Sequence, residues 1–189
     1  MAIINIKSKE RKPAALLFFM FFSIVSATIT GASVRDAVFL TQFDKSYLPV
    51  MFITIAVVMA GVIALYKKLT AGQDQIFVIS ISGALFSVSL FLLQSNLSGL
   101  FIPVLYIWME VVTILSIFQF WILAGEVFNA RQAKRIFTLM GAGGSFAGMG
   151  AGFGIKPFVS TFGSENLLFL TIFFIGISVV MAQMLRPFR

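Results

Sequence analysis

The chain has 189 residues, of which 59% are hydrophobic and only 11% are charged, and its mean hydropathy is +1.01. A water-soluble domain of this size has nowhere to place so much apolar surface, and long apolar runs are typical of membrane spans. The sequence contains no Cys and no His, which excludes disulfides, the usual zinc sites and catalysis by either residue.

Six apolar stretches follow one another, each long enough to cross a hydrocarbon core about 30 Å thick. The first follows the basic segment MAIINIKSKERKP and is longer than the apolar core of a cleaved signal peptide, so it is predicted to be a membrane helix. Pro49 and Pro103 lie near the starts of the second and fourth stretches, where a missing backbone N–H does little harm. The predicted helices cover residues 14–40, 47–66, 75–94, 100–128, 133–154 and 166–185.

The Lys and Arg residues predict the orientation of these helices. The net charge of +7 alone would fit nucleic-acid binding, but eleven of the 14 basic residues fall on one side of the six predicted spans and three on the other. The positive-inside rule makes the first side cytoplasmic, with anionic lipid headgroups as its partner and no nucleic acid. The basic residues of that side are Lys7, Lys9, Arg11, Lys12, Lys67, Lys68, Arg131, Lys134, Arg135, Arg186 and Arg189.

We therefore expect an all-α integral membrane protein with both termini in the cytoplasm. Residues 1–13 form a cytoplasmic tail, residues 14–185 a six-helix transmembrane domain, and residues 186–189 a second cytoplasmic tail. The expected location is the inner (cytoplasmic) membrane, as a multi-pass protein in contact with the lipid bilayer.

Glu110 is the most costly residue in the predicted spans. It lies about 16 Å into the fourth span, near the middle of the bilayer, where a charge costs at least about 2.5 kcal/mol. Such a carboxylate normally faces a polar cavity or a partner, which makes Glu110 a candidate functional residue. The alternative is a protonated Glu that is hydrogen-bonded to a neighbouring helix.

Arg35 and Asp36 close the outer part of the first span, and four hydroxyl residues below them share one helical face. This stripe either lines a hydrophilic path or packs against another helix, since Ser and Thr are common in both settings. Arg35 alone can also extend to the outer interface. The hydroxyl residues are Ser23, Ser26, Thr30 and Ser33.

The fifth span has a glycine face formed by Gly141, Gly144, Gly148 and Gly152. In a membrane, such a face lets another helix approach closely, and the segment lacks the GK[ST] of a phosphate-binding loop. Glu126, at the end of the fourth span, is expected to pair with Arg131 or Lys134 or to be solvated at the interface. No catalytic or metal-binding constellation is present, so we expect neither an enzyme nor a cofactor.

Two stretches resemble the nucleotide transporters of plastids and obligate intracellular bacteria, the ATP/ADP translocases with a major facilitator type of architecture. The first stretch is SVRDAVFLTQFDKSYLPVMFITIAVVMAGVIALYKKL and the second is MEVVTILSIFQFWILAGEVFNARQAKRIFTLMGAGG. Together they span roughly residues 33–152. The residues that match the family pattern are Arg35, Asp36, Lys68, Leu69, Glu110, Phe120, Trp121, Ala133, Lys134, Arg135, Phe137 and Gly141.

The resemblance implies one half-bundle of a major facilitator-type fold, because such transporters have about twelve helices and this chain has the first six. It implies a transport role for Arg35, Asp36, Glu110, Lys134 and Arg135, with ATP or ADP as the solute. Alternating access then requires a second six-helix half or a second copy of this chain. The alternative is a membrane anchor or regulatory module, derived from the same fold, that transports nothing.

Overall fold

The computed structural model describes the backbone of residues 8–189 and the side chains of residues 10–129, 132 and 136–189. This part of the chain contains six helices that are long and apolar enough to cross a membrane, as expected for a multi-pass all-α membrane protein. The six are α1 (Ser8–Gln42), α2 (Leu48–Thr70), α3 (Gln75–Gln94), α4 (Phe101–Val127), α5 (Ala130–Phe162) and α6 (Leu167–Met184), and two short 3₁₀ helices are η1 (Lys45–Tyr47) and η2 (Arg186–Phe188).

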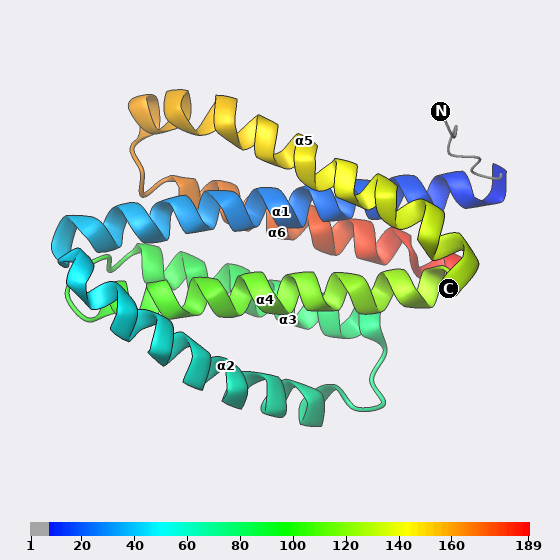
Figure 1. The fold of residues 1–189 in the computed structure, drawn as a ribbon, viewed down its shortest axis with the longest axis horizontal. Coiled ribbons are helices and arrows are strands. Elements are labelled where there is room, and N and C mark those ends of the chain that lie inside the picture. The colour runs from blue at the N-terminus through cyan, green and yellow to red at the C-terminus, as the bar shows by residue number, and fades with distance from the viewer. Residues whose placement is uncertain (1–7) are drawn as a thin grey trace.

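The helices run alternately up and down in one bundle (Figure 1). Helix α1 lies at its centre and packs on α4, α5 and α6, while α3 packs on α4 and α6. Helices α5, α1, α4 and α2 form the face turned to the viewer in Figure 1, with α6 and α3 behind α1 and α4. Helix α2 packs mainly on α4 and diverges from the bundle toward its C-terminal end.

The bounds of α3 agree with the prediction, and the other helices differ from it by one to eight residues. The largest correction concerns α5, which was expected to end at residue 154 but continues to Phe162 through Lys156 and Pro157. This helix has the lowest hydropathy of the six spans, so a basic residue and a proline next to its glycines resembled a loop. Helix α1 likewise begins at Ser8, within the segment expected to be a tail.

Polar side chains fix several helix ends. The Asp74 carboxylate accepts the backbone N–H of Phe77 and begins α3, and Asn129 and Gln132 form a reciprocal capping box at the start of α5. Gly163 ends α5 with a φ of 86°, a left-handed conformation that favours glycine. These contacts place the connections between helices outside the apolar bundle.

Two glycines allow the tightest helix crossings. A Cβ at Gly31 on α1 would collide with the Met109 side chain on α4, and a Cβ at Gly83 on α3 would collide with Val179 on α6. Lipid tails are as apolar as the helices, so close packing of this kind, rather than hydrophobic burial, holds a membrane bundle together. Gly31 brings α1 and α4 together close to the residues described next.

Candidate functional site

Arg35 on α1 and Glu110 on α4 form an ion pair between two membrane-length helices. The Arg35 Nη1 atom donates to Glu110 Oε1 at 2.7 Å, and Arg35 Nε donates to Asp36 Oδ1 at 2.9 Å. Glu110 lies nine residues after the start of α4, or about 14 Å along its axis, so this contact is well inside the span. The structure therefore brings together three of the residues that the sequence analysis singled out.

Tyr106 completes the cluster. It lies one turn before Glu110 on α4, and its ring is 4.5 Å from Arg35 Cζ, in the geometry of a cation–π contact. The Arg35 side chain is only 12% exposed, compared with 26% for Glu110 and 51% for Asp36. One guanidinium and two carboxylates give the cluster a formal charge of −1, so Arg35 is neutralised in this conformation.

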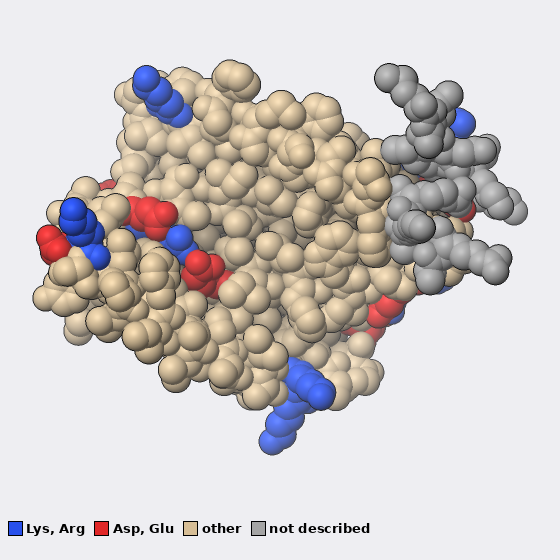
Figure 2. All heavy atoms as spheres, viewed as in Figure 1, with Lys and Arg blue, Asp and Glu red and all other residues tan. Residues whose placement is uncertain are grey.

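The cluster can be reached from outside the bundle through its carboxylates. Figure 2 shows acidic and basic residues together on the face formed by α5, α1, α4 and α2, toward one end, with residues other than Lys, Arg, Asp and Glu over most of the described remainder. A partly buried charge pair between membrane-length helices carries a desolvation cost, and such residues usually serve a function or fix one packing of the helices. The Arg35 guanidinium of such a pair can release the protein carboxylate and bind another anion in its place.

The hydroxyl stripe of α1 does not extend the cluster into a polar path. Ser23, Ser26 and Thr30 are buried, and both Ser23 and Thr30 donate to carbonyl oxygens of their own helix. The hydroxyls of Thr30 and Thr171 lie 2.9 Å apart across the contact between α1 and α6. Of the two interpretations left open by the sequence, these contacts favour helix packing.

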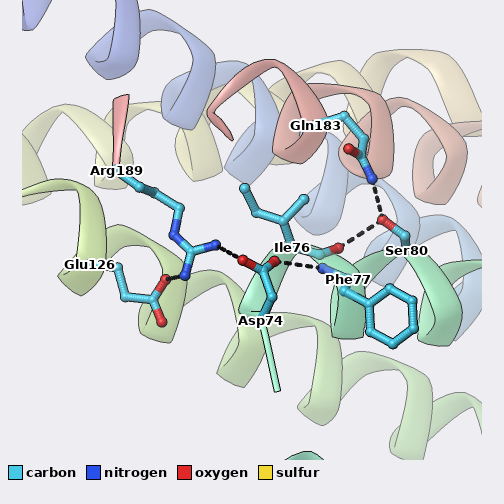
Figure 3. Close-up of polar contacts among 7 residues, drawn as sticks. All are labelled: Asp74, Ile76, Phe77, Ser80, Glu126, Gln183 and Arg189. Carbon is cyan, nitrogen blue, oxygen red and sulfur yellow. Dashed lines mark hydrogen bonds and ion pairs between the residues drawn. The ribbon is translucent and has the colours of Figure 1, made fainter. Parts of the chain in front are cut away.

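Lys134 and Arg135, which the resemblance implicates in transport, have side chains outside the described residues. Glu126 was expected to pair with Arg131 or Lys134 or to be solvated at the interface. The Arg131 side chain, like that of Lys134, lies outside the described residues. In the structure Glu126 Oε2 lies 2.7 Å from Nη2 of Arg189, whose Nη1 contacts Asp74 Oδ2 at 2.5 Å. Arg189 therefore ties the end of the chain to α3 and α4, as Figure 3 shows.

Asp74 is thus both a helix cap and an ion-pair partner. The backbone N–H of Phe77, together with the Arg189 guanidinium, holds the pKa of Asp74 below its ordinary value. Ser80 lies one turn after Phe77 on α3, and its Oγ accepts a hydrogen bond at 2.6 Å from Nε2 of Gln183 on α6 (Figure 3). The same end of the bundle is therefore connected by polar contacts among α3, α4 and α6.

The glycine face of α5 is only partly used within the chain. A Cβ at Gly144 would lie 3.2 Å from the Phe21 ring of α1, and one at the neighbouring Gly143 would lie 3.1 Å from the Phe18 carbonyl oxygen. A Cβ at Gly141, Gly148 or Gly152 would meet nothing within 4 Å. Within the chain, Gly144 therefore lies against α1, whereas Gly141, Gly148 and Gly152 leave space on the outer side of α5.

Sequence reasoning missed Tyr106, Arg189 and Gln119 as members of polar clusters. Gln119 on α4 is buried and its Oε1 accepts from Ser82 Oγ of α3 at 3.0 Å. The one-turn spacing from Glu110 could have identified Tyr106, whereas nothing local predicts the partners of Arg189. Among the described residues, no group of three or more Asp or Glu residues is arranged to hold a metal ion.

Comparisons with known protein families, curated proteins and solved structures found no match for this chain.

Proposed function

We propose that this chain is one six-helix half of a membrane transporter for a phosphate-bearing anionic solute of the ATP or ADP type. It works by alternating access together with a second six-helix bundle, which is either a separate half or a second copy. The single observation that carries the proposal is the Arg35–Glu110 ion pair, at 2.7 Å, between two helices of membrane-spanning length. Ionisable residues in such positions are expensive and usually mark the path of a substrate or ion.

The chemistry of Arg35 suits a phosphate group. A guanidinium presents a planar fork that binds two oxygens of a phosphate, and it keeps its charge in an apolar environment. Because Glu110 already accepts from Nη1, a phosphate that binds both Nη1 and Nη2 through the planar fork displaces that carboxylate. Glu110 then occupies the guanidinium whenever the solute is absent, so the unloaded site does not leave a lone cation inside the membrane.

The second candidate, a non-transporting anchor or regulatory module, is favoured by one specific observation. Two carboxylates and the Tyr106 ring already engage Arg35, and the formal charge of −1 on the cluster repels an anion. In that case the ion pair fixes how α1 and α4 pack and has no exchange partner. The two candidates predict different results in the following experiment.

The chain is reconstituted into liposomes loaded with ADP, and uptake of external radiolabelled ATP is measured. We expect Arg35→Ala to abolish uptake, because it removes the phosphate-binding group, and Glu110→Ala to lower uptake by about tenfold or more, because Arg35 then keeps only Asp36 as its partner when the solute is absent. Lys156→Ala is the matched control, since it removes an exposed cation of α5 outside the cluster. Equal uptake by wild type, the three variants and empty liposomes would refute transport by this chain.

A further inference from the structure

An apolar groove of about 490 Å³ separates α2 from α3 and α4. Its walls run from Val62 to Thr70 on α2, from Phe77 to Phe86 on α3, and from Trp108 to Leu115 on α4. Helix α2 has no buried residue in this stretch, and its two buried residues, Met51 and Met59, both precede it. The groove is therefore the space left where α2 diverges from the bundle, and it opens toward the membrane.

The length of the groove fits one leaflet of a bilayer. Its deep end includes Phe86, eleven residues after the start of α3, which places that end about 16 Å into the membrane. This is about half of a 30 Å hydrocarbon core. A helix from another subunit would cross the whole core, whereas an acyl chain extends from the interface to the bilayer middle.

The shallow end of the groove is polar and basic. Thr70 and Gln73 line it, and the exposed Lys67 and Lys68 lie at the same end of α2 without lining the groove, so their long side chains have to bend around the helix to reach it. Figure 2 shows basic atoms projecting at this end of α2. Asp74, the carboxylate in the connection to α3, is already engaged by Arg189, so it does not neutralise the two lysines.

Besides the two lysines, the Tyr66 hydroxyl is a second observation that points to a molecule bound in the groove. Tyr66 lines the groove four residues before the end of α2, about 6 Å from the end of the helix. Its Oη atom is buried and has no hydrogen-bond partner in the described part of the chain. Buried hydroxyls normally have a partner, and the ester carbonyls of a glycerophospholipid lie at this depth and accept hydrogen bonds.

We propose that this groove binds one anionic glycerophospholipid, with an acyl chain against α3 and α4 and its phosphate near Lys67 and Lys68. An apolar groove matches the acyl chain, and the two lysines near its shallow end match the anionic headgroup, since each Lys near a membrane surface adds attraction for anionic headgroups. The site is independent of solute transport, so it holds for either candidate function.

Trp108 at the deep end of the groove is a natural reporter, because the chain has only two tryptophans. The Trp121→Phe variant is reconstituted in phosphatidylcholine vesicles that contain phosphatidylglycerol or phosphatidylcholine brominated on the acyl chain, and quenching of Trp108 fluorescence is measured. We expect brominated phosphatidylglycerol to quench at a lower mole fraction. Adding Lys67→Gln and Lys68→Gln should reduce this preference by on the order of tenfold.

Lys45→Gln with Lys156→Gln is the matched control, because it removes the same charge at the opposite end of the helices and should leave the preference unchanged. In Trp108→Phe, the remaining Trp121 reports lipids elsewhere around the bundle, so the two lysine changes should not affect its quenching. Equal quenching of Trp108 by both lipids, or a preference that survives the loss of both lysines, would overturn the proposal. Absence of quenching by either lipid would mean that protein covers the groove and would overturn it as well.

Discussion

The bundle contains two clusters of the same composition in different surroundings. Arg35 with Asp36 and Glu110 lies within the membrane-length helices, and Arg189 with Asp74 and Glu126 lies at their ends. The Arg35 side chain is 12% exposed and that of Arg189 is 25% exposed, and all four contacts are 2.5–2.9 Å long. Ion pairs of similar length can therefore contribute differently to the free energy of unfolding. The free-energy cost of leaving one partner unpaired depends on how far that partner is removed from water.

The largest effect is expected in the Arg35 cluster. Arg35→Leu leaves Glu110 unpaired between the helices and should lower the free energy of unfolding by about 3 kcal/mol, whereas Glu110→Leu leaves Arg35 paired with Asp36 and should lower it by less. The double variant removes both charges and should be less destabilised than the sum of the two single variants. Denaturant unfolding in detergent micelles measures all four proteins. If the two changes simply add, Arg35 and Glu110 are not coupled.

A smaller effect is expected at the ends of the helices. Arg189→Gln removes the partner of two accessible carboxylates and should cost about 1 kcal/mol or less. This loss should shrink as salt is added, because exposed charges are screened within about 10 Å at 0.1 M ionic strength. Unfolding of wild type and variant at low and high salt checks both points. If Arg189→Gln lowers the free energy of unfolding as much as Arg35→Leu does, the different exposure of the two clusters does not affect their contribution to stability.

The two clusters also show which features of the structure the sequence could predict and which it could not. The apolar runs predicted six spans, and the bounds of α3 are confirmed. The cost of a charge inside a span singled out Arg35 and Glu110 individually. Their contact was not predicted, because 75 residues separate them and only the packing of α1 on α4 brings them together. The partners of Arg189 were unpredictable for the same reason.

Local sequence patterns could not predict features of α5 that depend on its contacts with other helices. Lys156 and Pro157 resembled the end of a helix, yet α5 continues past both. The glycine spacing places four small residues on one face of α5, but the spacing alone does not identify which of them contact a neighbouring helix. Of the four, only Gly144 has a described neighbour, the Phe21 ring of α1, within 4 Å of the position a Cβ would take.

The smallest effect concerns pH. Asp74 has a lowered pKa in the folded protein, so its ionised form stabilises that state above the ordinary value near 3.9. The contribution is lost as the pH falls through the lower folded value. Asp74→Asn keeps a helix cap but removes the charge, so it should be less stable than wild type at neutral pH. In unfolding experiments the difference should begin to shrink below about pH 4 and disappear once the pH is below the folded value. A difference that persists in stronger acid would exclude Asp74 ionisation as its cause.

The central claim is that Arg35 exchanges Glu110 for the phosphate of a solute. The most direct measurement is the affinity of the detergent-solubilised chain for ATP, determined for wild type, Arg35→Gln and Glu110→Gln. Glu110→Gln should bind ATP more tightly than wild type, because the competing carboxylate is removed, and Arg35→Gln should not bind it. Equal affinity in all three proteins, or weaker binding by Glu110→Gln than by wild type, would contradict the claim.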